Sequence, residues 1–242
     1  MLGTIVNAAA IAVGGLVGLL LKKGIKESWT ASVHKAVGIA VLVIGLNGVI
    51  ANMITVEADG KLSSSGELLV VISLIVGTII GEMLRLDDHM EKFSKGIEKK
   101  FAAKGFAASF MNATILFCVG AMAIIGSLQD GLTGDHTILF AKAVLDGVTA
   151  IIFGATLGMG VVFSAIPVLI YQGIISLLAG VLSKYLQGEL LVQICAVGYA
   201  IIIAIGVNFL KKDRIKILNM LPAIFIPVIW HFIQMLIAYI KG

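Results

Sequence analysis

Two ionisable residues, Lys142 and Asp146, lie inside a long apolar stretch of the chain. Because they are four residues apart, a helix would place them on one face, where they can form an ion pair. Charged groups are costly within a membrane span and are functional hypotheses by default. Two interpretations stay open. The pair could be structural and hold its helix at the outer interface, or Asp146 could couple the movement of a proton or ion, with Lys142 tuning its pKa.

A second group of polar residues occupies 126–136 and contains Gln129, Asp130, Asp135 and His136. The density of Gly and Asp in this segment predicts turns. We therefore expect the two carboxylates, the amide and the imidazole to meet at the outer mouth of the protein, close to the ion pair. Asp and His also suit a metal ion, but turn capping explains Asp130 and Asp135 more simply. We predict neither a metal site nor a cofactor.

Several uncharged polar side chains lie within other apolar stretches, and most are expected to form hydrogen bonds between helices. They are Asn7, Asn47, Gln172, Asn208, Asn219, His231 and Gln234. We expect three of them to contribute ligands at mid-depth to a pathway for an ion or solute: Asn47, Gln172 and Asn208. Asp146, Lys142, Gln129 and Asp130 would form its outer gate or coupling site.

Composition identifies the elements that must position these residues. Of the 242 residues, 59% are hydrophobic and 13% are charged, whereas soluble domains are about 25% charged. Such a chain is a polytopic membrane protein. Eight apolar stretches approach the roughly 20 residues that span a bilayer. They are 2–21, 36–54, 66–84, 109–128, 138–160, 164–183, 190–210 and 217–240. The expected fold is an all-α bundle of eight transmembrane helices in one domain.

Clusters of basic residues follow the first, third and seventh stretches, within 22–35, 85–104 and 211–216. With eight spans, all three clusters face the cytoplasm and both termini lie outside, as the positive-inside rule requires. Fusing the fifth and sixth stretches would place 211–216 outside. The segment 87–104 has the pattern of an amphipathic helix, which would lie on the lipid headgroups or form a solvated connector.

The chain contains an apparent internal repeat. The motif A-V-G-x-A followed by I-G-x-N occurs at 36–47 and again, with one extra residue, at 196–208. An odd number of crossings separates the two copies, so the repeat would be inverted, which is typical of transporters. Repeat A would cover 1–84 and repeat B 164–240, with two central helices at 109–160.

Pairs of glycines four residues apart occur in the first, third and fifth stretches. Such pairs let helix backbones approach closely, and a lining for a substrate path is the alternative. The pairs are Gly14 and Gly18, Gly77 and Gly81, and Gly154 and Gly158.

Several segments resemble a bacterial membrane family catalogued as domain of unknown function 554. The main ones are FCVGAMAIIGS at 117–127 and QDGLTGDH at 129–136, joined by MLGTIVN at 1–7, LDG at 145–147, FSAIP at 163–167 and NMLPA at 219–223. The resemblance covers essentially the whole chain. It implies a multi-pass protein of the bacterial inner membrane without an assigned activity.

Two functions remain open from the sequence. The first is a transporter or channel for a small ion or polar solute. The second is a scaffold or partner-binding subunit without transport activity, which self-associates through its glycine faces as a homo-oligomer. No Ser-His-Asp set, Walker loop or metalloprotease helix is present, so we do not expect an enzyme. The expected partners are the lipid bilayer and a small solute, not nucleic acid.

Overall fold

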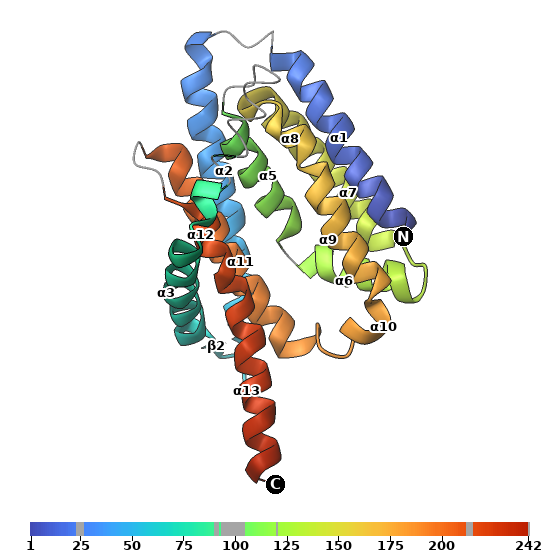
Figure 1. Cartoon of the computed structure of the whole chain (residues 1–242), viewed down its shortest axis with the longest axis vertical. Coiled ribbons are helices and arrows are strands. Elements are labelled where there is room, and N and C mark those ends of the chain that lie inside the picture. Colours follow the sequence, from blue (N-terminus) through green and yellow to red (C-terminus); the bar gives the residue numbers. More distant parts are fainter. Residues whose placement is uncertain (23–26, 90–91, 93–104, 120, 212–214, 242) are drawn as a thin grey trace. The chain divides into compact units, whose positions relative to one another are not determined.

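The protein is built almost entirely of α-helices. A computed structural model describes residues 1–22, 27–89, 92, 105–119, 121–211 and 215–241 (Figure 1). In this described part, seven helical segments are long and apolar enough to cross a membrane, or eight if a bent pair is one span. The expectation of a multi-pass helical membrane protein is confirmed. Most of the amphipathic helix predicted at 87–104 lies outside the described residues. The residues of this segment that are described, 87–89 and 92, are helical.

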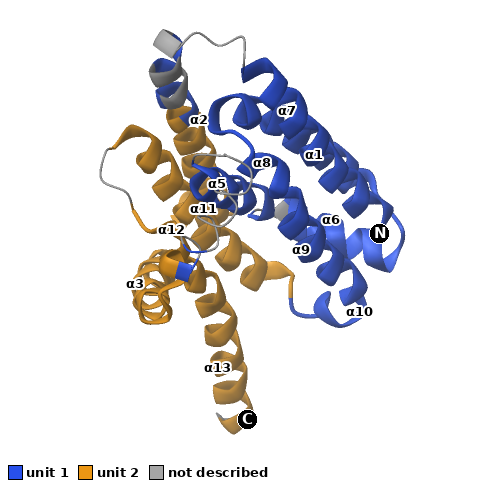
Figure 2. Ribbon diagram, turned by 45° about the horizontal axis from the view of Figure 1, so that its top comes forward, with its two compact units in different colours: residues 1–37, 89–185 blue, residues 38–88, 186–242 orange. Residues whose placement is uncertain are grey.

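The chain forms two compact units (Figure 2). Unit 1 comprises 1–37 and 89–185, and unit 2 comprises 38–88 and 186–242. The helices of unit 1 are α1 (Leu2–Lys22), α5 (Phe106–Cys118), α6 (Ala121–Leu132), α7 (Thr137–Leu157), α8 (Gly160–Phe163), α9 (Ala165–Leu177) and α10 (Ala179–Leu182). Helix α2 (Glu27–Met53) begins in unit 1 and continues into unit 2. The remaining elements of unit 2 are β1 (Ile54–Val56), β2 (Leu62–Ser64), α3 (Glu67–Leu84), α11 (Gly188–Leu210), α12 (Ile217–Met220), the 3-10 helix η1 (Leu221–Phe225) and α13 (Ile226–Lys241).

Two predicted spans are less regular than their hydropathy suggests. The fourth, expected at 109–128, consists of α5 and α6, whose axes differ by 62°. The eighth is divided into α12, η1 and α13, with Pro222 at the start of the 3-10 turn. The fifth and sixth spans are separate, because α7 ends at Gly158 with a φ of 101°, a backbone conformation that favours glycine. Residues 54–64, which the sequence left between two spans, form an antiparallel hairpin.

Glycines allow α1 and α7 to pack closely in unit 1. Gly14 lies against Gly147, and Gly18 lies against Ile151 and Gly154. Residue numbers rise together along both helices, so α1 and α7 are parallel. Helix α9 packs against α1 in the opposite direction, since Thr4 contacts Ser176 whereas Asn7 contacts Gln172. Three helices from distant parts of the sequence thus surround one buried polar region.

Glycines also allow close packing in unit 2. Gly77 of α3 lies against Ala223, and Gly81 lies against Asn219, so the segment 219–223 fits closely onto α3. The contact is extended by Lys216, whose ammonium lies 3.2 Å from the carboxylate of Glu82. This hydrogen bond raises the pKa of Lys216. Gly158, one of the six glycines that were expected to pack helices together, is instead the residue that follows the last turn of α7.

The close approach of α1 and α7 predicts a strong cost for adding one methyl group. A Cβ on Gly18 would clash with the backbone at Ile151, Gly154 and Ala155, which cannot move without separating the helices. We expect Gly18→Ala to lower the free energy of unfolding by about 1–3 kcal/mol. Gly180→Ala is the matched control, because no atom of the described residues lies within 4 Å of its Cβ position. Thermal unfolding of the purified variants measures both, and equal stability would contradict the packing described.

Candidate functional site

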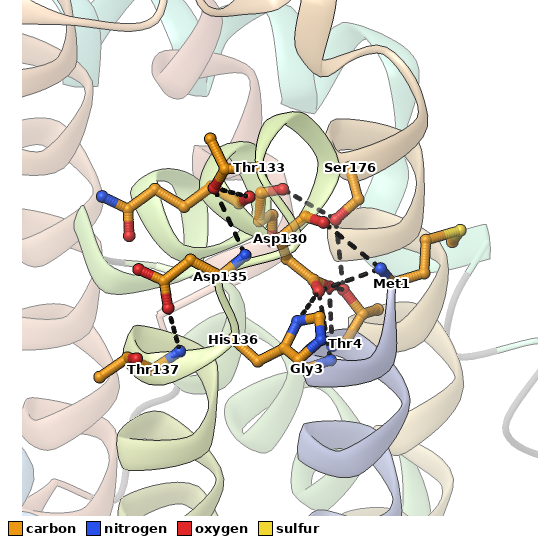
Figure 3. Close-up of polar contacts among 11 residues, drawn as sticks. Met1, Gly3, Thr4, Asp130, Thr133, Asp135, His136, Thr137 and Ser176 are labelled. Carbon is orange, nitrogen blue, oxygen red and sulfur yellow. Dashed lines mark hydrogen bonds and ion pairs between the residues drawn. The ribbon is translucent and has the colours of Figure 1, made fainter.

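Asp130 lies near the end of α6, and its side chain is fully buried. Its carboxylate accepts hydrogen bonds from the amides of Gly3 and Thr4, at 3.3 and 3.2 Å, and from the Thr4 hydroxyl at 3.0 Å (Figure 3). Amides in the first turn of a helix have no partner within that helix. The positive end of the helix dipole also favours a carboxylate there. Asp130 therefore caps α1 from a different helix.

Further polar groups complete this network at the start of α1. The Nδ1 of His136 lies 2.6 Å from the Asp130 carboxylate, and the ammonium of Met1 lies 3.0 Å from it. The Ser176 hydroxyl lies 3.3 Å from that of Thr4 and donates to the carbonyl of Ser127 at 2.9 Å. The network joins α1, α6, α9 and the α6–α7 loop, so it anchors the end of the bundle.

The other polar residues of 126–136 do not join Asp130. Asp135 accepts from the Thr137 amide at 3.0 Å at the start of α7, and hydrogen bonds from the Thr137 side chain and backbone lower the pKa of this carboxyl. Gln129 takes part through its backbone carbonyl, which accepts from Thr133. Of the four residues expected at the outer mouth, only Asp130 and His136 bind each other. Across the part of the chain that the structure describes, no three His, Cys, Asp or Glu side chains are grouped for a metal ion.

A second polar cluster lies deeper in unit 1 and contains the predicted ion pair. The Lys142 ammonium donates to the Asp146 carboxylate at 2.6 Å, and the two side chains are only 7% and 10% exposed. Asp146 lies close to the middle of α7 (Thr137–Leu157). The structural interpretation had placed the pair at the outer interface. The carboxylate is about 14 Å along the helix from its first residue.

Two buried amides adjoin this ion pair. The Asn7 side chain on α1 donates to the Gln172 carbonyl on α9 at 3.2 Å, and both residues have no exposed surface. Asn7 also lies close enough to Asp146 to interact with its carboxylate. The Oδ1 of Asn7 and the Nε2 of Gln172 have no hydrogen-bond partner among the residues that the structure describes. We call Asn7, Lys142, Asp146 and Gln172 the central cluster.

The ion pair of the central cluster lies within electrostatic range of the end of α5. Helix α5 ends at Cys118, and Lys142 and Asp146 are close enough to act on Cys118 electrostatically. One turn earlier on α5, the buried hydroxyl oxygen of Thr114 is a further polar atom for which the described part of the chain offers no partner. The charged pair of the central cluster therefore lies within electrostatic range of the end of α5.

The comparisons with known proteins agree with the resemblance drawn from the motifs. The profile of a family described as a protein of unknown function, DUF554, matches residues 2–232. The chain belongs to the DUF554 family. It is 31% identical over 233 residues to the uncharacterized membrane protein YdfK of Bacillus subtilis, covering 96% of each chain. It is 29% identical over 231 residues to the uncharacterized protein YqgA of Escherichia coli, covering 93% of each chain. No solved structure matches.

Two residues that the sequence assigned to the pathway of this DUF554 chain lie apart from each other in unit 2. Asn47 is exposed on α2. Asn208 forms two hydrogen bonds with the backbone of Ile215, at 2.7 and 2.8 Å. These bonds connect the last turn of α11 to the segment that precedes α12. Because Gly38 lies against Phe209 and Gly45 against Ile203, Asn47 and Asn208 are separated by roughly 10 Å along the helices.

Sequence reasoning missed how several residues of the DUF554 chain are used. Asn7 was expected only to bond between helices, yet it contacts both Gln172 and Asp146. Gly3, Thr4 and Ser176 were not singled out at all. Their roles depend on contacts across more than 100 residues of sequence, and no local spacing signals such contacts.

Proposed function

We propose that this DUF554 protein is a membrane transporter or channel for a small ion or polar solute, and that the central cluster is its binding or coupling site. The observation that carries the proposal is the buried Lys142–Asp146 pair together with the unpaired atoms of Asn7 and Gln172. A buried polar group without a partner costs about 1–3 kcal/mol. A cluster with only a structural role would be expected to pair all its members.

The broken helices support the same function. Transporters commonly place their sites where transmembrane helices are interrupted, because freed backbone groups and side chains can then bind solutes at mid-depth. The break between α5 and α6 is near the central cluster, and the unpaired Thr114 hydroxyl lies on α5. Neither hydropathy nor residue spacing had indicated a break in this span.

Reciprocal contacts in unit 2 support an inverted repeat, which is part of the proposal. When the two copies of the I-G-x-N motif are aligned, Gly45 is equivalent to Gly206, and Leu42 is equivalent to Ile203. Gly45 lies against Ile203, and Gly206 lies against Leu42. Each contact is therefore the image of the other.

A second reciprocal pair of contacts follows the same register. Gly38 lies against Phe209, and Gly48 lies against the Tyr199 ring. The two helices run in opposite directions, as an inverted repeat requires.

Helix directions favour eight crossings. Helices α1 and α7 are parallel, so an odd number of crossings must separate them. Helices α2 and α3 supply two, and the α5–α6 pair taken as one bent span supplies the third. With eight crossings, the basic segments within 22–35, 85–104 and 211–216 share one side. The positive-inside rule makes that side cytoplasmic.

This topology predicts the behaviour of reporter fusions. A reporter enzyme that works only in the periplasm should be active when fused after Gly242, and inactive when inserted within 211–216. A reporter that works only in the cytoplasm should give the opposite pattern at the same two positions. Cytoplasmic activity after Gly242 would reject the eight-crossing arrangement and the inverted repeat together.

The alternative function is a self-associating scaffold, which was based on the glycine faces. Gly14, Gly18 and Gly154 pack α1 against α7, and Gly77 and Gly81 pack α3 against the segment 219–223. These glycine faces are covered within one chain. They are therefore not available to a second copy without unfolding the first.

Transport is tested by reconstituting the purified protein into liposomes and screening labelled monovalent ions, amino acids and small neutral solutes for uptake. We expect at least one solute to cross faster than in protein-free liposomes and in liposomes containing heat-unfolded protein. Saturation of the rate with solute concentration would indicate a transporter, and a linear dependence would indicate a channel. Background rates for every solute in all three classes would contradict the proposal.

A further inference from the structure

The central cluster combines opposite charges with a spare donor and a spare acceptor. Lys142 and Asp146 have a net charge of zero, Gln172 offers an unpaired N–H group, and Asn7 offers an unpaired carbonyl oxygen. We propose that the cluster binds a small zwitterion, with its ammonium at Asp146 and Asn7 and its carboxylate at Lys142 and Gln172. This inference rests on the proposed function and names its substrate class.

Charge balance favours a zwitterion over a simple ion. Adding a cation or an anion to a neutral buried pair would leave one uncompensated charge in a region of low dielectric, which is strongly unfavourable. A zwitterion adds no net charge. When it separates Lys142 from Asp146, it supplies each of them with an opposite charge, so the cost of opening the ion pair is offset within the site.

The unpaired atoms match the two ends of such a ligand. A carboxylate accepts several hydrogen bonds and an ammonium donates three. The Nε2 of Gln172 and the Oδ1 of Asn7 are a donor and an acceptor, and both side chains are completely buried. A lone cation would leave the Gln172 donor unsatisfied, and a lone anion would leave the Asn7 acceptor unsatisfied.

The neighbouring residues limit the size of the ligand. The cluster is formed by α1, α7 and α9, and α1 packs against each of the other two helices. Its sequence neighbours include Ala8, Ala143 and Gly147. Ala8 and Ala143 are themselves buried. The structure therefore favours an α-amino acid with a short side chain.

The proposal is tested by direct binding to the full chain in detergent or lipid nanodiscs, with glycine, L-alanine and L-serine as probes. We expect at least one of them to bind saturably by titration calorimetry and to raise the melting temperature. Methylammonium acetate, which carries the same two charges on separate ions, should not do so at equal concentration. The absence of saturable binding for all three amino acids, or an equal effect of methylammonium acetate, would overturn the proposal.

A variant of Gln172 connects binding to the cluster. Gln172→Leu removes the spare donor and should weaken zwitterion binding about tenfold or more. Gln193→Leu is the matched control, because Gln193 lies in unit 2 and its side chain donates to Glu189 at 2.8 Å. The Gln193→Leu variant should bind the zwitterion with the affinity of the wild type. Gln172→Asn retains the amide on a shorter stem, so it tests the site if the leucine variant does not fold. Wild-type affinity in the folded Gln172 variant would reject this site.

The two proposals fail in different ways. Saturable zwitterion binding without flux of any solute would leave this inference standing and reject transport. Flux of another solute by a protein that binds none of the three amino acids would support transport and reject the zwitterion.

Discussion

Replacing Asp146 by Asn should abolish flux while leaving the protein folded. The substitution removes one charge near the middle of α7 but keeps a side chain of similar size that still accepts a hydrogen bond. Lys142 can retain that contact or extend its long stem towards water. If Asp146 binds or couples the solute, we expect flux per folded molecule to fall by more than about 100-fold, the effect of losing roughly 3 kcal/mol of interaction. Reconstituted protein of known folded fraction provides the measurement.

Controls distinguish this coupling role from a structural ion pair. Asp59→Asn removes an equivalent charge in the exposed hairpin turn, where Asp59 pairs with Lys61 at 2.7 Å, and it should transport as the wild type does. The exchange Lys142→Asp with Asp146→Lys restores a pair in reversed order. A structural pair would recover its stability and flux after this exchange, whereas a coupling carboxylate at a fixed position would not. Wild-type flux in Asp146→Asn would end the coupling hypothesis.

The sequence predicted the features that depend on local composition and spacing. Apolar length identified the spans, because a bilayer requires about 20 apolar residues regardless of tertiary contacts. The spacing of Lys142 and Asp146 indicated their ion pair, because residues four apart share a helix face. The glycine spacing in α1 and α3 likewise corresponded to close helix contacts. Each of these inferences required only one helix.

Features that join distant helices could not be obtained in this way. The contact between Asn7 and Gln172 depends on α1 and α9 being neighbours, and neither residue has a distinctive local pattern. The segment 126–136 was predicted to form turns and to gather its own carboxylates. Residues 126–132 instead continue helix α6, and Asp130 is used by the first turn of α1 and Asp135 by α7. Hydropathy also predicted one continuous fourth span, because an apolar average does not register where a helix bends.

The second large effect is expected at Asp130, where anchoring and gating make different predictions. Asp130→Ala would leave the buried amides of Gly3 and Thr4 without an acceptor and His136 without its partner. Breaking a buried charged interaction of this kind costs about 3–5 kcal/mol.

Asp135→Ala is the matched control for this substitution. Asp135 is an exposed carboxylate that accepts a hydrogen bond from the first amide of α7, and its loss should cost only about 1 kcal/mol. Thermal unfolding of the two variants measures the difference, and equal stabilities would contradict the anchoring role.

Flux per folded molecule then separates an anchor from an outer gate. The donors around Asp130 already occupy its carboxylate, so an arriving solute would have to compete with several hydrogen bonds and with the end of α1. We therefore expect folded Asp130→Ala to transport at close to the wild-type rate, unlike Asp146→Asn. Asp130→Asn retains an acceptor oxygen and should show intermediate stability with unchanged flux. A folded Asp130 variant without flux would instead return Asp130 to the outer gate, and the start of α1 would then have to move during transport.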